Sequence, residues 1–276
     1  MTVTRHPFAR RDRLVFAHRG GAKLAPENTM SAFERGVSLG ADGVECDVHL
    51  SRDGIPVVIH DATLERTTDA SGAVSSRTAD ELAAVDAGYH FAADGAHPFR
   101  GQGIGVPRLE EVLHRFPDIR VIIEMKQGDP ALARAVVDVV RRTAAIERVC
   151  VGSFHQVGLN VIRAEEPRIA TSASQSEARL TLYRSWYRWP FGAKRPYCAF
   201  QVPQRAGRLQ VISPAFVRQA HQDGARVDVW VVDQPDEIRQ LFDCGVDGVI
   251  SDRPDIAIAT RDQWLQAQEK HCISRR

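Results

Sequence analysis

The stretch from Gly43 to Asp61, GVECDVHLSRDGIPVVIHD, constrains the fold because it presents two carboxylates and a histidine that can meet. Side chains of an extended strand alternate between its two faces, so Glu45 and Asp47 point the same way. The turn at residues 51–54 contains Asp-Gly, a hairpin signal, and a second extended arm follows it up to His60. Folding this arm back on the first predicts that His60 lies opposite Asp47 or its neighbours.

A Glu-x-Asp pair on a strand more often belongs to a solvated edge than to a ligand site. In this strand the opposite face carries Val44, Cys46 and Val48, which predicts that it packs against helices. The acidic face would then look into the mouth of a barrel, where bare carboxylates are costly without a cation or hydrogen-bond donors. We therefore expect the two acids to belong to a functional site.

Length and composition suit one domain. The chain has 276 residues, 43% of them hydrophobic, and a single (β/α)8 barrel typically takes about 250 residues. A net charge of +1 with dispersed basic residues does not indicate a nucleic-acid partner. The cysteines lack CxxC spacing, so they are expected to be reduced, buried thiols of an intracellular, cytoplasmic protein. We recognise no signal peptide and no transmembrane span of about 20 apolar residues.

Two further strand ends carry charged side chains. The apolar run Leu14–Ala17 delivers His18-Arg19-Gly20-Gly21 at its end, where the active sites of parallel barrels are assembled. The glycines allow a sharp turn beside an anion, and Arg19 offers a planar fork that suits phosphate. A later apolar strand places Glu124 and Lys126 at its end with the same spacing as the earlier acids.

Two segments between these strands have their own signals. Pro26-Glu27-Asn28-Thr29 precedes Ser31-Ala32-Phe33-Glu34, a capping-box pattern that predicts a helix to about Leu39. Glu27 and Asn28 are expected to cap this helix and to support the site with a hydrogen bond. Residues 62–106 are rich in Thr, Ser, Gly and Asp, which predicts a loop-rich excursion over a functional site.

The alternation of extended and helical segments favours an α/β fold, a (β/α)8 TIM barrel. The strands are expected to begin at Leu14, Gly43, Arg120, Arg148, Arg168, Cys198, Arg226 and Gly248. We expect one domain over residues 1–276 with an insertion at about 62–106. An open doubly wound sheet is the alternative, although no GxGxxG fingerprint follows the first strand.

Taken together, these motifs resemble those of the glycerophosphodiester phosphodiesterase family, and they run nearly from end to end of the chain. The matching stretches are His18-Arg19-Gly20, Pro26-Glu27-Asn28-Thr29, Glu45-Cys46-Asp47, Val57-Val58-Ile59-His60-Asp61, Glu124-Met125-Lys126, Trp230 and Gly248-Val249-Ile250-Ser251-Asp252. The resemblance implies a TIM barrel with a small insertion after the second strand. It also implies metal-dependent hydrolysis of small glycerophosphodiesters to glycerol 3-phosphate and an alcohol.

The resemblance implies a role for each of eight side chains. The assignments are His18 and His60 as the acid and base pair, Glu45, Asp47 and Glu124 as ligands of one divalent cation, Arg19 and Lys126 as phosphate-binding groups, and Trp230 as a wall of the substrate pocket. An all-oxygen ligand set suits Mg²⁺ or Ca²⁺. The chain reads Trp230-Val231-Val232-Asp233 where family members often read Trp-Thr-Val-Asn, which changes the expected polarity of that wall.

Other functions stay open. A lysophospholipase D would apply the same chemistry to amphiphilic lysophospholipids. A noncatalytic phosphate-binding barrel would need a loss from this set of residues, and none is visible. A metal-dependent lyase or aldolase could use the acidic site, but it would not need paired histidines around an anion clamp.

The stretch Tyr183–Tyr197, YRSWYRWPFGAKRPY, bears on the choice of substrate. One interpretation is an outer barrel helix whose rings pack under the next loop. The other is that rings such as Trp186 and Trp189, with arginines between them, meet an anionic lipid surface or line the path of an acyl chain. Peripheral membrane contact is therefore an open alternative.

Overall fold

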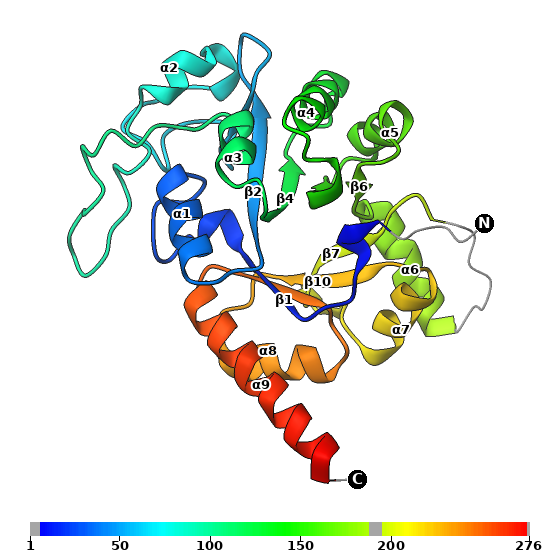
Figure 1. The fold of residues 1–276 in the computed structure, drawn as a ribbon. Coiled ribbons are helices and arrows are strands. Elements are labelled where there is room, and N and C mark those ends of the chain that lie inside the picture. Colours follow the sequence, from blue (N-terminus) through cyan, green and yellow to red (C-terminus); the bar gives the residue numbers. More distant parts are fainter. Residues whose placement is uncertain (1–5, 188–194, 275–276) are drawn as a thin grey trace.

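The computed structural model describes residues 6–187 and 195–274 as a parallel (β/α)8 barrel (Figure 1). The barrel strands are β1 (Leu14–Ala17), β2 (Gly43–Leu50), β4 (Arg120–Met125), β5 (Val149–Gly152), β6 (Ala170–Thr171), β7 (Ala199–Pro203), β10 (Arg226–Trp230) and β11 (Gly248–Ser251). They lie in the order β6-β5-β4-β2-β1-β11-β10-β7, and each neighbouring pair is parallel. Between β6 and β7 the barrel is nearly closed by two hydrogen bonds: Ala173 N–H donates to Ala199 O (2.8 Å), and Cys198 N–H to Thr171 O (3.0 Å). The predicted fold class is confirmed.

Helices cover the outside of the strands (Figure 1). They are α1 (Met30–Ser38), α3 (Leu109–Arg115), α4 (Pro130–Arg142), α5 (Gln156–Glu165), α6 (Gln175–Tyr187), α7 (Pro214–Gln222), α8 (Pro235–Asp243) and α9 (Pro254–Ser274). The predicted apolar face of β2, carried by Val44, Cys46 and Val48, is fully buried in a cluster that includes apolar residues of α3, α4 and α5. Glu45 and Asp47 therefore point into the barrel, as the alternation predicts.

The N-terminal end of the barrel is sealed. The short 3-10 helix η1 (Pro7–Ala9) places Phe8 against Phe16 of β1, with ring centroids 5.9 Å apart. Above these rings, Arg226 is fully buried and pairs with the equally buried Asp228 at 2.7 Å. Since this end is filled, the opposite end, where the strands finish, is the open one.

The segment after β2 begins with a hairpin. The strand β3 (Pro56–Val58) runs antiparallel to β2, with Val48 opposite Val58, and Gly54 takes a positive φ of 78° in the turn. The segment between β3 and α3 contains η3 (Val74–Ser76) and α2 (Ala79–Ala83), and it projects from one side of the barrel (Figure 1). It is held by a separate small core of buried residues, which comprises Val57, Ile59, Leu64, Val74, Ala79, Leu82, Val85, Ala87 and Val106.

Several predicted boundaries need correction. Helix α1 is capped by Thr29 rather than Ser31, because the Thr29 side chain accepts a hydrogen bond from Ala32 N–H (3.2 Å). Glu34 does not close a capping box, since it pairs with Arg115 of α3 at 2.8 Å. The strand expected from Arg168 is reduced to the two residues of β6.

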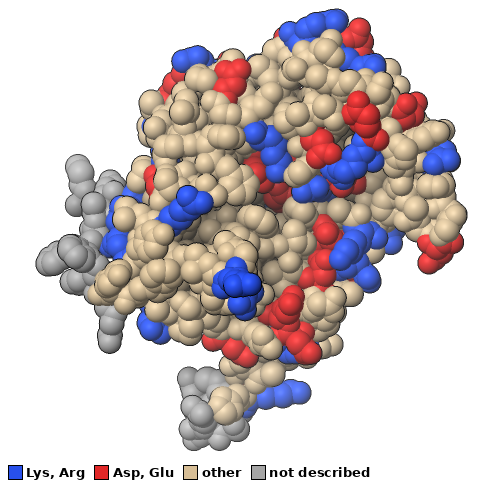
Figure 2. Space-filling model, turned by 180° about the vertical axis from the view of Figure 1, so that it is seen from behind, with Lys and Arg blue, Asp and Glu red and all other residues tan. Residues whose placement is uncertain are grey.

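The surface carries mixed charge, and the described cysteines are free thiols. Lys and Arg are interspersed with Asp and Glu on the face in Figure 2, which is hollowed near its centre. Cys46 and Cys150 are buried as predicted, whereas Cys198 and Cys244 are only partly buried, and all four are free thiols. Within the described part of the chain, no helix is both long and apolar enough to span a bilayer.

Candidate active site

The residues proposed from the sequence converge on one cavity at the carboxyl ends of the strands. Its volume is about 680 Å³, and its walls include His18, Arg19, Glu45, His60, Glu124, Lys126 and Trp230. The eighth candidate, Asp47, is fully buried behind this wall. The parallel register of β2 and β4 sets Asp47 directly beside Glu124, which explains why two distant segments share one site.

The three acids form a compact cluster. Glu45, Asp47 and Glu124 each offer a carboxylate oxygen, and these oxygens lie within 4.8 Å of one another. Burial and the neighbouring charge of Asp47 raise the pKa of Glu45 to about 8, and burial likewise raises the pKa of Glu124. Crowded buried carboxylates resist ionisation in this way unless positive charge offsets them.

Asp47 is held by hydrogen bonds from Asn28 and by neighbouring positive charges. The Asn28 side chain donates from Nδ2 to Asp47 Oδ2 (2.8 Å), and its Oδ1 accepts from Asp47 N–H (3.2 Å). Asn28 adopts a φ of 58°, a left-handed conformation that Asn tolerates better than most residues. Lys126 Nζ lies 2.8 Å from Asp47 and 3.1 Å from Glu124. Burial opposes ionisation, but the charges of Lys126 and Arg19 outweigh it and lower the pKa of Asp47.

The donor set fits a divalent cation. Asp47 Oδ1 and Glu124 Oε1 are buried without a well-aligned hydrogen bond, although both lie near the Lys126 ammonium. Carboxylate oxygens grouped this closely suit Mg²⁺ or Ca²⁺, whose oxygen ligands stand about 2.0–2.6 Å from the ion. Glu45, Asp47 and Glu124 are therefore the residues that could hold such an ion.

Arg19 is fixed by three acids. Its backbone N–H donates to Glu45 Oε2 (3.0 Å), its Nη1 donates to Glu27 Oε1 (2.9 Å), and its Nε lies 3.1 Å from Asp47 Oδ2. The adjacent Gly20 has a φ of 87°, and a Cβ there would lie 2.5 Å from the backbone of Ala32. Only glycine lets this turn pack so closely on α1. The guanidinium is engaged by carboxylates, so its predicted phosphate contact stays a prediction.

Each candidate histidine is oriented by a carboxylate. His18 Nδ1 lies 2.6 Å from Asp252 Oδ1, and its Nε2 lies 3.9 Å from Glu45 Oε2. Burial lowers the pKa of His18, but the Asp252 hydrogen bond and the Glu45 charge outweigh it, so the net shift is upward. His60 Nδ1 lies 2.6 Å from Asp61 Oδ1. Both rings can therefore donate Nδ1–H to an acid and leave Nε2 for chemistry.

The sequence reasoning missed two contributors. The partner of His18 is Asp252, whose backbone N–H donates to Asp233 Oδ1 (2.9 Å). Arg66, from the insertion, donates to Asp61 (2.5 Å) and to both oxygens of Glu27 (2.8 Å each).

Only the first of these contributors carried a sequence signal. Asp252 follows the last barrel strand, the position at which the other site residues occur, whereas Arg66 lies in a segment without periodicity. The Arg66 hydrogen bond, aided by His60, lowers the pKa of Asp61 to about 2.

Trp230 forms part of the far wall. Its ring meets that of Phe154 edge to face, with centroids 6.2 Å apart and an interplanar angle of 81°. Val231, at the position where the family often has Thr, also lines the cavity and is exposed. Valine in place of threonine at position 231 therefore makes this wall more apolar.

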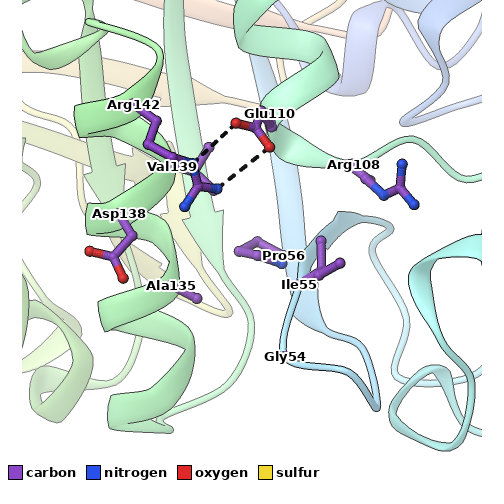
Figure 3. A pocket seen from close by; sticks show the side chains of 9 residues that line it. All are labelled: Gly54, Ile55, Pro56, Arg108, Glu110, Ala135, Asp138, Val139 and Arg142. Atoms are coloured by element: carbon purple, nitrogen blue, oxygen red, sulfur yellow. Dashed lines mark hydrogen bonds and ion pairs between the residues drawn. The ribbon is translucent and has the colours of Figure 1, made fainter.

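A smaller hollow of about 350 Å³ lies outside the barrel, between the β2–β3 turn, α3 and α4 (Figure 3). Arg142 bonds Glu110 across it (3.2 Å), as the dashed lines show, and Arg108 pairs with Asp80. None of the eight candidate residues lines this hollow. Its arginines are already paired, so the cavity at the strand ends is the candidate site.

Comparison with known proteins agrees with this geometry. The chain is 32% identical over 250 residues to a glycerophosphodiester phosphodiesterase from Caldanaerobacter subterraneus subsp. tengcongensis, covering 89% of this chain and 96% of that one. The crystal structure of a glycerophosphodiester phosphodiesterase from Agrobacterium tumefaciens superposes with a TM-score of 0.73 at 28% identity, covering 90% of this chain and 99% of the other.

A phosphodiesterase from Oleispira antarctica, in complex with the product sn-glycerol-3-phosphate, superposes with a TM-score of 0.74 at 25% identity, covering 93% and 99% of the two chains. The sequence profile of the glycerophosphoryl diester phosphodiesterase family matches residues 18–256, a span that contains all eight candidate residues. The chain therefore belongs to the glycerophosphoryl diester phosphodiesterase family, and it is a phosphoric diester hydrolase.

Proposed function

We propose that this protein hydrolyses glycerophosphodiesters to glycerol 3-phosphate and an alcohol, with a divalent cation bound by Glu45, Asp47 and Glu124. The observation that carries the proposal is a pair of histidines, each anchored at Nδ1 by its own carboxylate, beside that acidic cluster. The product bound to the Oleispira antarctica relative supports the same product here.

The reaction requires water to attack phosphorus and the alcohol to leave. One histidine, His18 or His60, takes the proton of the attacking water at Nε2, and the other donates a proton to the departing oxygen. Asp252 and Asp61 can each accept Nδ1–H from one ring, which leaves Nε2 for the reaction, unprotonated in the base and protonated in the acid. A bound divalent cation would polarise the phosphoryl oxygen and offset the charge that develops on it.

Positive side chains complete the proposed site. Lys126 lies at the cavity wall between Asp47 and Glu124, where its ammonium can face a phosphate oxygen as well as the acids. Arg19 lines the same wall, and its Nη1 is bonded to Glu27. We assign both to phosphate binding and Trp230 to the wall that contacts the substrate. The free cysteines support the cytoplasmic location that we propose.

The direct test is a product assay with glycerophosphocholine, following glycerol 3-phosphate by a coupled dehydrogenase. Activity is expected to disappear after EDTA treatment and to return with Mg²⁺ or Ca²⁺. Metal-stripped protein that retains full turnover would refute the cation assignment, and metal-loaded protein without any turnover would refute the diesterase proposal.

A further inference from the structure

One arginine of the insertion contacts two parts of the site at once. Arg66 donates to Asp61 (2.5 Å), which in turn lies 2.6 Å from the His60 ring. It also donates to both oxygens of Glu27 (2.8 Å each), and Glu27 Oε1 accepts from Arg19 Nη1 (2.9 Å). Arginines and carboxylates therefore alternate from one end of the site to the other. We call these five side chains the charge chain.

The contact between Arg66 and Glu27 is bidentate. Nη1 of the guanidinium donates to Oε2 and Nη2 donates to Oε1, so the planar group fixes the orientation of the carboxylate as well as its position. The third nitrogen, Nε, donates to Asp61 Oδ2. All three nitrogens of Arg66 are thus engaged. A lysine carries a single nitrogen on a flexible stem, so it could not hold both carboxylates in this geometry.

The charge chain differs from an exposed surface ion pair, which contributes little. The side chain of Glu27 is only 16% exposed and that of Arg19 is 17% exposed. Burial opposes the ionisation of Glu27, but the Arg66 hydrogen bond and the Arg19 charge outweigh it, so the pKa of Glu27 is lowered. The Arg66 hydrogen bond is also the main cause that lowers the pKa of Asp61. Both carboxylates are therefore ionised acceptors at neutral pH.

The insertion holds Arg66 on a hydrogen-bonded turn. The backbone N–H of Thr68 (3.0 Å) and its hydroxyl (2.9 Å) both donate to Leu64 O, and both residues are buried. Leu64 belongs to the small core of the insertion, and its N–H donates to Gly72 O (3.1 Å). Arg66 lies in the middle of this turn, so the insertion fixes its backbone while its guanidinium reaches the site.

A buried arginine pair on the outer helices shows the difference. Arg184 of α6, which one interpretation of the sequence placed against an anionic surface, is buried and pairs with Asp223 at 2.7 Å. Asp223 follows α7, so this pair joins two covering helices and not the strand ends. Trp186 packs edge to face on Tyr183, with ring centroids 5.3 Å apart. The remaining residues of interest in this stretch lie outside the described part of the chain: Arg188, Trp189, Phe191 and Lys194.

We propose that Arg66 is a positioning residue for the hydrolysis: through Asp61 it fixes His60 for proton transfer, and through Glu27 it fixes Arg19 beside the phosphate. This inference rests on the proposed diesterase function. Arg66 is not among the residues that line the cavity, so it acts through its two partners and not on the substrate. The insertion thereby takes part in the reaction, because it supplies the link between the two ends of the charge chain.

Arg66→Ala tests this link in the intact, metal-loaded enzyme with glycerophosphocholine as substrate. The variant releases both ends of the charge chain, so kcat/KM is expected to fall about 100-fold, the loss that a misplacement of about 1 Å can cause. Asp61→Asn weakens mainly the contact to His60 and is expected to lower kcat. Glu27→Gln weakens mainly the contact to Arg19 and is expected to raise KM. Parental kcat and KM in Arg66→Ala would overturn the inference.

Two measurements separate the geometry of Arg66 from its charge. Arg66→Lys keeps the charge but lacks the planar fork, so its loss is expected to approach that of Arg66→Ala. The Arg66 side chain is 47% exposed, so an added guanidinium can enter the space that alanine leaves. Methylguanidinium at millimolar concentration is expected to raise kcat/KM of Arg66→Ala at least about tenfold, because it restores the paired hydrogen bonds. Parental activity in Arg66→Lys, or no rescue of Arg66→Ala, would overturn the inference.

Arg77→Ala is the matched control. Arg77 lies in the same insertion, and its Nη2 donates to Ser71 O (3.2 Å), away from the site. This variant is expected to keep the parental kcat and KM. Equal losses in Arg77→Ala and Arg66→Ala would show a general loosening of the insertion and would overturn the positioning role. Absence of glycerophosphocholine turnover in the parent enzyme would instead refute the diesterase function.

Discussion

Replacing Asp252 with Asn tests whether His18 must be held by a carboxylate. The 2.6 Å contact between His18 Nδ1 and Asp252 Oδ1 is a short hydrogen bond to a charged group. Such bonds contribute roughly 1.5–3 kcal/mol, which corresponds to about a 10- to 150-fold loss of kcat/KM if the bond positions the ring in the transition state. The amide of Asn can also donate to Nδ1, which would favour the opposite tautomer.

The pH profile separates positioning from general destabilisation. Burial lowers the pKa of His18, and the Asp252 carboxylate is the main group that raises it. Its removal is therefore expected to shift the limb of the kcat/KM profile assigned to His18 toward lower pH. The assay is glycerophosphocholine hydrolysis between about pH 5 and 9, the range in which histidine titrates.

A matched control lies three residues further along the chain. Asp255→Asn removes a carboxylate that pairs with Arg253 at 2.8 Å and has no contact with His18. This variant is expected to keep the parental rate and profile, whereas Asp252→Glu is expected to recover part of the activity lost in Asp252→Asn. A parental rate and pH profile in Asp252→Asn would refute the positioning role.

Three further outcomes are expected. Glu45→Gln keeps the shape of the side chain but removes its charge, so the cation affinity measured by calorimetry is expected to fall. The loss is expected to be at least the roughly 10- to 100-fold seen when residues that contact metal ligands are changed. Unchanged affinity would exclude Glu45 as a ligand. His60→Ala is expected to lower kcat at least about 100-fold on an unactivated diester, and an unchanged kcat would remove His60 from the mechanism. Arg66 and His60 hold the pKa of Asp61 at about 2 in the folded protein, whereas the pKa of an unfolded Asp is about 4. Ionised Asp61 therefore stabilises the fold above about pH 4, by about 1 kcal/mol after allowance for solvent screening. The difference in urea unfolding free energy between the parent and Asp61→Asn is expected to be constant above about pH 4 and to shrink toward pH 2, and a difference that grows with acidity would contradict this assignment.

The sequence was sufficient for the barrel and for the acidic cluster because both follow from local periodicity. The alternation in β2 assigns Glu45 and Asp47 to one face, and the parallel register with β4 then brings in Glu124. Charged side chains that recur at the ends of apolar strands can be recognised in the sequence without knowledge of distant contacts. Seven of the eight candidates line one cavity and the eighth, Asp47, lies directly behind it, but Trp230 was implied only by the family resemblance.

Contacts between distant segments could not be predicted in the same way. His18 and Asp252 are separated by 234 positions, and only closure of the barrel between β1 and β11 makes them neighbours. Arg66 reaches Glu27 and Asp61 from an irregular segment whose path is set by its own small core. The cap at Thr29 could not be assigned from the sequence because Ser31 is an even better capping residue type than Thr29, and only backbone geometry separates them.

The charge balance of the site links cation binding to substrate binding. Three carboxylates, Glu45, Asp47 and Glu124, face two cationic side chains, Arg19 and Lys126, which leaves one net negative charge when all are ionised. That sign opposes a phosphodiester, which is itself an anion, and burial together with the neighbouring charge of Asp47 raises the pKa of Glu45 to about 8. A divalent ion held by the acids would change the balance to one net positive charge, which attracts the substrate. The affinity for the diester, and not only the rate of its hydrolysis, is therefore expected to depend on the metal.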